Sequence, residues 1–262
     1  MRFETPWRRR RRALDAPFSE AWRRVLERRW GLWPTFDELE RSRLERLTTA
    51  FLLDRRFEAA KGFAVTDEVR VLVAAQASLL LLGFDEAPDV DLYANVQSII
   101  VHRGTVMLHG SRTVGASGSG LVSDERMAVS GQAHHRGPVL LAWSTVAYEA
   151  RHPARGQNVV LHEFAHQLDM LDGIVDGTPP IPEPARRDRF VEVCDTVYQQ
   201  VRRHDDAVLR DYAGTDPGEF FAVATETFFS IPLDLRREHP ELYLVLADFY
   251  AQDPAARLER HS

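Results

Sequence analysis

The stretch NVVLHEFAHQLDMLDG, residues 158–173, carries two histidines four positions apart, His162 and His166, with Glu163 directly after the first. The residues around them are mostly apolar, which predicts a buried helix. In an α-helix, side chains four positions apart project from the same face, so both imidazoles can bind one metal ion at about 2.0–2.1 Å. Glu163 is rotated by about 100° around the helix axis and can face a water molecule beside that ion.

A plain core helix is the alternative explanation for the two histidines, with each imidazole hydrogen-bonded to a neighbour. Apolar residues cover this helix nearly all round, and two adjacent imidazoles are unfavourable there unless something binds them. The pattern therefore favours a zinc site. Since a catalytic zinc ion has three protein ligands and one open position, this hypothesis requires a third ligand elsewhere in the chain.

Asp172 is the first candidate for the third ligand, because it follows in the same stretch. To bring Asp172 back to the metal, the chain would have to bend sharply after the helix. Such a bend favours glycine at the position that Asp169 occupies. We therefore interpret Asp172 as part of a turn at 169–173.

The other candidates lie in DYAGTDPGEFFAVATETFF, residues 211–229. Asp216, Pro217 and Glu219 form the sequence signature of a capping box at the start of a helix, which gives Glu219 a structural role of its own. Glu226 lies about two turns further along the same face. Either glutamate can be the ligand on this reasoning, and the more open position at the start of a helix favours Glu219.

The composition is that of an ordinary soluble globular protein of 262 residues, 44% of them hydrophobic and 27% charged, which excludes a fully disordered chain. The net charge of −6 offers no general attraction to nucleic acid or to anionic membranes. The longest apolar run, residues 71–84, is too short to cross a bilayer. Arg8–Arg12 are expected to belong to a solvated end, because no apolar stretch follows them as an export signal requires.

Cys194 is the single cysteine, so an intrachain disulfide and a thiolate zinc site are excluded. It lies in a stretch with a helical pattern and is interpreted as a buried, inert thiol. A lone cysteine fits a reducing compartment. The expected location is the cytoplasm.

Helices are predicted to dominate outside residues 95–143, which gives an α+β fold. Two helices are expected within residues 19–54, on either side of Pro34. Thr66 is predicted to cap a further, apolar helix, and Gly83 is expected to end it. Other helices are predicted at 157–170, 184–204, 217–229 and near the C-terminus.

Residues 95–143 have the composition of short strands, with β-prone runs in VQSIIVH, TVMLHG and PVLLAWS. The Gly/Ser-rich segment GSRTVGASGSG, residues 110–120, separates them and predicts a mobile loop. We expect a small sheet, mixed or mostly antiparallel. Residues 138–143 are also a candidate edge along which an extended peptide substrate can lie.

Taken together, these segments resemble the bacterial metallopeptidases related to the Mlc titration factor. The resemblance runs from about residue 17 to residue 257, nearly the whole chain. It is carried by VRVLVAAQASLLLLGF at 69–84, RGPVLLAWS at 136–144, HEFAHQLD at 162–169, DYAGTDPGEFFAVATETFF at 211–229 and FYAQDP at 249–254.

The resemblance implies a zincin-like fold of the gluzincin type and an aminopeptidase-like activity on peptides, with one zinc ion per chain. It implies that the zinc ligands are His162, His166 and Glu219, that Glu163 is the general base, and that Tyr212 donates a hydrogen bond to the tetrahedral intermediate. Glu226 would then accept a hydrogen bond from the N–H of a ligand histidine. The resemblance also implies an alternative function, a regulatory protein that sequesters a transcriptional repressor and whose zinc site is structural or vestigial.

The predicted organisation is a basic N-terminal end at 1–16 and a single domain at 17–257. His134 and His135 depart from the family pattern, in which an aromatic residue is common, and are expected to be exposed loop residues. Within the domain we expect a helical scaffold at about 17–90, the sheet and loop at about 95–143, the zinc-site helices at about 157–229 and C-terminal helices to about 252.

Overall fold

The computed structural model describes residues 13–60, 62–84, 93–104, 106–108, 112–114, 138–204 and 206–261. The predictions for Arg8–Arg12, for His134 and His135, and for most of the Gly/Ser-rich segment lie outside the described residues. No helix within these ranges is both long enough and apolar enough to cross a membrane.

The first helices of the described chain are α2 (Glu20–Arg29), α3 (Glu38–Asp54) and α4 (Asp67–Leu79), with a short 3-10 turn at Trp33–Thr35 between the first two. Thr66 caps α4 as predicted, and its side chain accepts a hydrogen bond from the N–H of Val69. The prediction that Gly83 ends this helix is wrong, because α4 already ends at Leu79. Gly83 instead allows close packing, since a Cβ there would lie 2.1 Å from the carbonyl oxygen of Tyr250.

In the described part of the chain, the main sheet has three strands, β1 (Arg56–Ala59), β2 (Ser98–His102) and β5 (Val139–Ala142), in the order β1-β2-β5. Both pairings are parallel, so the expected antiparallel arrangement is wrong for this sheet. Parallel neighbours need a crossover connection, and the connection from β1 to β2 contains α4. Among the strands of the described ranges, antiparallel pairing is confirmed only for the separate pair β3 (Val106–Leu108) and β4 (Arg112–Val114).

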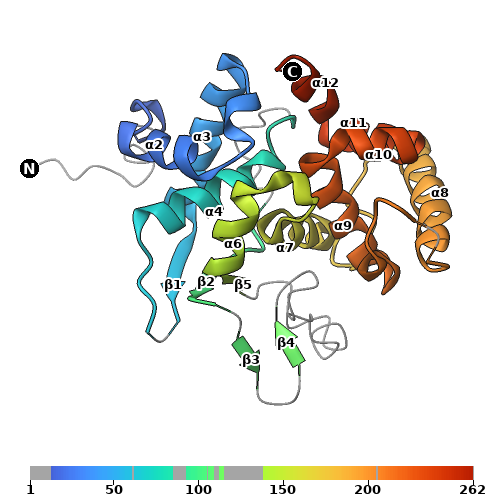
Figure 1. The fold of residues 1–262 in the computed structure, drawn as a ribbon, viewed down its shortest axis with the longest axis horizontal. Helices are drawn as coiled ribbons and strands as arrows, with labels where there is room; N and C mark the ends of the chain where they lie inside the picture. The colour runs from blue at the N-terminus through green and yellow to red at the C-terminus, as the bar shows by residue number, and fades with distance from the viewer. Residues whose placement is uncertain are drawn as a thin grey trace, which may run out of the picture.

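The chain after β5 is helical, and the mostly helical α+β class is confirmed. Its helices are α6 (Trp143–Arg151), α7 (Val159–Asp169), α8 (Pro184–Val201), α9 (Pro217–Ser230), α10 (Pro232–Glu238), α11 (Pro240–Tyr250) and α12 (Pro254–Glu259). Figure 1 shows α7 and α9 at the centre, with α6 above the sheet and α8, α10 and α11 to the upper right of α9. Every residue of α9 from Gly218 to Ser230 is buried, so its polar side chains need partners inside the protein.

Candidate metal centre

The helix that carries both histidines, α7, begins inside the protein at Asn158. The side-chain oxygen of Asn158 accepts hydrogen bonds from two N–H groups of the first turn, at 3.1 Å each. The N–H of Asn158 itself donates to Glu226 Oε2 at 2.6 Å, and the N–H of Val159 donates to Glu149 Oε2 at 2.6 Å. These partners satisfy the N–H groups that a helix start leaves free, and they fix α7 against its neighbours.

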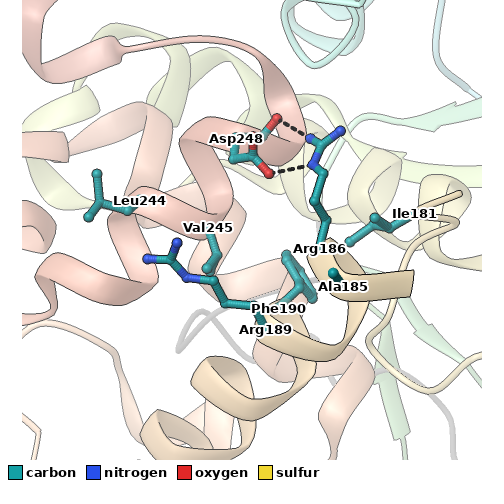
Figure 2. A pocket seen from close by; sticks show the side chains of 8 residues that line it. All are labelled: Ile181, Ala185, Arg186, Arg189, Phe190, Leu244, Val245 and Asp248. Atoms are coloured by element: carbon teal, nitrogen blue, oxygen red, sulfur yellow. Dashed lines mark hydrogen bonds and ion pairs between the residues drawn. The ribbon is translucent and has the colours of Figure 1, made fainter. Parts of the chain in front are cut away.

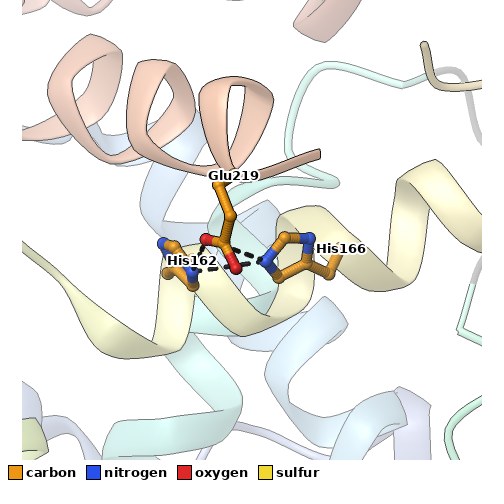
Figure 3. Close-up of side chains that lie close together, drawn as sticks. All are labelled: His162, His166 and Glu219. Carbon is orange, nitrogen blue, oxygen red and sulfur yellow. Dashed lines mark hydrogen bonds and ion pairs between the residues drawn. The ribbon is translucent and has the colours of Figure 1, made fainter. Parts of the chain in front are cut away.

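Three potential metal ligands converge, two from α7 and one from α9 (Figure 3). The Nε2 atoms of His162 and His166 are 3.2 Å apart, and Glu219 Oε2 lies 3.0 Å from the first and 3.6 Å from the second. A tetrahedral ion with ligands at about 2.0–2.1 Å would hold the ligand atoms roughly 3.3–3.4 Å apart. The three observed separations therefore outline one face of a coordination tetrahedron.

Glu219 is directed to the histidines by the way α9 begins. Asp216 is the N-cap and accepts a hydrogen bond from the N–H of Glu219 at 2.9 Å. In a complete capping box, the Glu219 carboxylate would return to the N–H of Asp216. It instead faces the two imidazoles and is only 5% exposed. One half of the predicted capping box is present, and the carboxylate is left available as a ligand.

Glu226 makes the contact that was predicted for it, because its Oε1 lies 2.7 Å from Nδ1 of His162. The side chain of Glu226 is completely buried. An ionised carboxylate can only accept hydrogen bonds, so His162 donates its Nδ1–H, and the lone pair of the neutral imidazole is on Nε2. That lone pair faces Glu219 and His166, where a metal ion would bind.

Arg210 completes the surroundings of Glu226, although no sequence pattern singles it out. Its Nη2 donates to Oε1 at 2.5 Å and its Nη1 to Oε2 at 3.2 Å. The signal that could have found it is indirect, since a glutamate in the middle of an apolar helix needs a cationic partner. Asn158 was equally missed, although asparagine directly before an apolar helix is an N-cap signal.

The donor set fits a cation. Glu219 Oε2 is buried and, within the described part of the chain, receives no hydrogen bond. His162 Nε2 lies 3.0 Å away; it holds a lone pair in the neutral imidazole and donates to Glu219 Oε2 when the imidazole is protonated on both nitrogens. Burial lowers the pKa of His162, but the hydrogen bonds and charges of Glu219 and Glu226 outweigh burial and raise the pKa to about 10. The site therefore stabilises positive charge at Nε2, which a proton or a metal ion can supply.

Glu163 and Tyr212 lie beside the ligand set. Burial raises the pKa of Glu163, while the charges of His162 and His166 oppose this rise. The ring of Tyr212 is 6.1 Å from the ring of His162, centroid to centroid. Burial, followed by the charge of Glu219 and a hydrogen bond with it, raises the pKa of Tyr212 well above its ordinary value. Tyr212 therefore keeps its proton and can act as a donor.

Asp172 is not brought to the site. It is exposed and belongs to a 3-10 turn at Met170–Asp172, and its Oδ1 accepts a hydrogen bond from the N–H of Ile174 at 3.0 Å. The interpretation of Asp172 as a turn residue is confirmed. Cys194 is buried as predicted, and burial raises the pKa of its thiol, which keeps it unreactive.

A separate cavity of about 270 Å³ lies between α8 and α11 and contains none of the predicted site residues. Figure 2 shows Arg186 directed at Asp248, with Nε 2.7 Å from Oδ2. Arg189 pairs with Glu241 at 2.9 Å. Because both arginines already have partners, they are not free to hold a ligand. The lining residues are Ile181, Ala185, Arg186, Arg189, Phe190, Leu244, Val245 and Asp248.

Comparison with known proteins agrees with the geometry. The chain is 32% identical to an uncharacterised protein of Synechocystis over 253 residues, which cover 95% of this chain and 89% of that protein. It is 31% identical to Mlc titration factor A of Pectobacterium atrosepticum over 237 residues, 87% and 84% of the two chains. Mlc titration factor A of Serratia proteamaculans is 29% identical over 86% of this chain and 84% of its own length.

These matches confirm the resemblance seen in the sequence. The profile of one peptidase family, the glucose-regulated metallo-peptidases M90, matches residues 4–251, which include all three converging ligands. The chain is therefore a member of the glucose-regulated metallo-peptidase M90 family.

Proposed function

We propose that the protein is a zinc-dependent peptidase that uses His162, His166 and Glu219 as metal ligands. The observation that carries this proposal is the convergence of their ligand atoms at separations of 3.0 to 3.6 Å. Two imidazoles and one carboxylate form a typical catalytic zinc set, because they leave the fourth position open. A structural zinc site usually has four protein ligands, mostly cysteines, and Cys194 lies on a different helix, α8.

The roles of the remaining side chains follow from their chemistry. When bound, zinc would supply a Lewis acid that acidifies water and polarises the carbonyl group of a peptide bond. Glu163 accepts the proton of the attacking water and returns it to the leaving amine. Burial raises the pKa of Glu163 above its ordinary value, which is the direction that favours proton uptake from the water. Tyr212 donates a hydrogen bond to the oxygen on which negative charge develops.

The substrate backbone is proposed to lie along β5. This strand pairs with β2 on one edge, and no described strand pairs with its other edge. An extended peptide can add to such an edge through main-chain hydrogen bonds. A crystal structure in which a bound peptide inhibitor bypasses residues 138–143 would contradict this part of the proposal.

The proposal includes a zincin-like fold of the gluzincin type, an aminopeptidase-like specificity and a cytoplasmic location. The specificity is supported by the resemblance to metallopeptidases related to the Mlc titration factor. It is tested by comparing a peptide that has a free N-terminus with its N-acetylated copy. Cleavage of the free peptide alone is expected, and equal cleavage of both would show an endopeptidase instead. Recovery of the protein outside the cytoplasm on cell fractionation would contradict the location.

The decisive experiment is the Glu163→Gln substitution. We expect about one zinc per chain by elemental analysis in both wild type and variant, and peptide hydrolysis only in the wild type. Glu192→Gln, at an exposed position of α8, serves as the control and should retain activity. Full activity in Glu163→Gln would remove Glu163 as the base. A wild type without zinc, even after incubation with the metal, would overturn the proposal as a whole.

A second candidate function is the binding of a regulatory protein. It is supported by the relatives that are named Mlc titration factor A. We propose that this chain also binds a transcriptional repressor related to Mlc, because a peptidase can bind such a partner as well. Calorimetry with purified Mlc of Pectobacterium atrosepticum tests this, using the wild type and Glu163→Gln. Equal binding by both proteins is expected, and the absence of binding by both would exclude this partner.

A further inference from the structure

We propose that Arg210 is a positioning residue of the metal centre. It fixes the carboxylate of Glu226, through it the orientation of His162, and it also packs against Tyr212. This inference rests on the metal site of the proposed function, and it concerns how the ligands are held before a metal arrives.

The contact between Arg210 and Glu226 is a fork that meets both carboxylate oxygens. Nη2 lies 2.5 Å from Oε1 and Nη1 lies 3.2 Å from Oε2. A paired contact of this kind fixes the plane of the carboxylate as well as its position, because two parallel hydrogen bonds must be kept. A single ammonium group would hold the charge without fixing the plane.

The orientation of this carboxylate decides where His162 points. Oε1 accepts from Arg210 and from Nδ1 of His162, at 2.7 Å, while Oε2 accepts from Arg210 and from the N–H of Asn158, at 2.6 Å. Rotation of the carboxylate would break contacts on both oxygens. Glu226 therefore directs the Nδ1–H of His162, and the Nε2 lone pair on the opposite side of the ring is aimed at the metal position.

Arg210 also touches the residue that is predicted to donate to the substrate. Its guanidinium carbon lies 5.7 Å from the centroid of the Tyr212 ring. Because a cation over an aromatic face is attracted to it, this contact helps to hold the ring. The centroid of the same ring lies 6.1 Å from that of the His162 ring. Arg210 therefore contacts both Glu226, which orients His162, and Tyr212.

The backbone around Arg210 is held on both sides. In the preceding turn, Asp206 Oδ1 accepts hydrogen bonds from the N–H groups of Val208 and Leu209, at 2.8 and 2.6 Å. The carbonyl of Arg210 accepts from the N–H of Ala213 at 2.9 Å. Arg210 is the N-cap of the 3-10 helix η4 (Asp211–Gly214), so its side chain starts from a fixed point.

An ion pair that serves only stability is the alternative explanation. Removal of such a pair would lower the free energy of unfolding. It would not alter how the folded protein coordinates a metal ion. The metal-binding constant and the spectrum of the bound metal therefore separate the two roles. Both can be measured without a peptide substrate.

The experiment compares Arg210→Met, Arg210→Lys and wild type. Zinc affinity is measured by competition with a chromophoric chelator, and the coordination geometry by the visible absorption spectrum after Co²⁺ is bound. We expect Arg210→Met to bind zinc about 10–100-fold more weakly, with an altered Co²⁺ spectrum. Arg210→Lys should fall between the two, because lysine keeps the charge but not the fork.

Arg202→Met is the matched control. Arg202 also lies over a tyrosine ring, 5.7 Å from the centroid of Tyr198, and also packs near η4, next to Gly214. It is exposed, and no contact links it to the metal ligands in the described structure. Zinc affinity and the Co²⁺ spectrum should therefore match the wild type.

Each outcome decides a different point. If Arg210→Met has the zinc affinity and the Co²⁺ spectrum of the wild type, the inference is overturned. If Arg210→Met does not fold, wild-type zinc affinity and Co²⁺ spectrum in Arg210→Lys would overturn it. If Arg210 acts through Glu226, the double variant Arg210→Met/Glu226→Gln should lose less affinity than the product of the single losses; losses that multiply would overturn this route. A wild type that binds no zinc would overturn the metal site itself, whereas zinc binding without peptide cleavage would overturn only the peptidase.

Discussion

Nε2 of His239 lies 2.7 Å from Oδ2 of Asp206, and the pair joins two parts of the chain that are distant in sequence. His239 ends α10 and precedes α11. Asp206 opens the turn that leads to Arg210 and Tyr212, and its carboxylate is almost entirely buried. The ion pair therefore connects the C-terminal helices to the segment that carries Arg210 and Tyr212 beside the metal centre.

The Asp206–His239 pair should make stability depend on pH. Burial alone would raise the pKa of Asp206, but hydrogen bonds from His239 and the backbone lower it below its ordinary value of 3.8. A lowered pKa in the folded state stabilises the fold above the pKa of the unfolded chain, about 3.9, and this contribution is lost as pH falls through the folded-state pKa.

We expect His239→Gln to reduce the free energy of unfolding at pH 7 by about 1–3 kcal/mol. The difference from the wild type should shrink as the pH falls below about 4, because the unfolded chain binds its proton first, and it should be lost once the folded wild type binds a proton on Asp206 at a lower pH. Urea unfolding between these pH values measures both effects. A difference that stays constant with pH would contradict the assignment.

Glu219 and Glu226 should differ in their effect on metal content. Glu219→Ala removes a ligand, so zinc should be lost on dialysis. Glu226→Gln keeps all three ligands and should weaken zinc binding by roughly 10–100-fold. Elemental analysis and chelator competition give the two values. If Glu226→Gln loses its zinc and Glu219→Ala keeps it, the two glutamates have been assigned the wrong way round.

Tyr212 should affect turnover and not metal content. Removal of one donor to a developing oxyanion lowers kcat by about 10²–10³-fold, so Tyr212→Phe should show a loss of this size with zinc unchanged. Tyr198→Phe, on α8, is the control and should leave kcat and zinc as they are. An unchanged kcat in Tyr212→Phe would remove the proposed donor.

Gly177 should be more sensitive to substitution than Gly173, although both have positive φ angles, +77° and +95°. A Cβ at Gly173 meets nothing within 4 Å, so Gly173→Ala should lower the free energy of unfolding only by the strain of an alanine in the left-handed region, about 1–2 kcal/mol. A Cβ at Gly177 would lie 2.2 Å from the carbonyl oxygen of Pro217, at the start of the helix that carries Glu219.

Gly177→Ala should therefore destabilise the protein further and displace a ligand. We expect a lower free energy of unfolding than in Gly173→Ala and a weaker affinity for zinc. Urea unfolding of the metal-free proteins and chelator competition measure the two quantities. Equal losses in both alanine variants would show that the contact with Pro217 relaxes at little cost.

The helix with the two histidines could be predicted because its information is local. The spacing of His162 and His166 fixes their common face, and the apolar residues around them indicate burial. The third ligand was different, since Glu219 and Glu226 lie on one face of α9. Which of them meets the Nε2 atoms depends on how α9 crosses α7. The residue pattern favoured Glu219 only slightly, and the resemblance to a known family strengthened that choice.

The sheet was mispredicted for a similar reason. β1 is only four residues long, and three of them, Arg56, Glu58 and Ala59, are exposed, so it lacks the apolar pattern of a buried strand. It is recognisable as a strand only through its pairing with β2, which is distant in sequence. Arg210 shares this property, because its proposed role depends on side chains that it meets only in the folded structure, above all Glu226 of α9.

Because the ligands come from two helices, metal binding should affect how fast the protein is degraded in the cell. A metal ion held by α7 and α9 would be a reversible cross-link, and a ligand at 100 times its Kd adds about 2.7 kcal/mol to the free energy of unfolding. Degradation by cellular proteases often follows the small open fraction of a protein. Cells short of zinc would therefore clear this chain faster, and its abundance would report the supply of the metal.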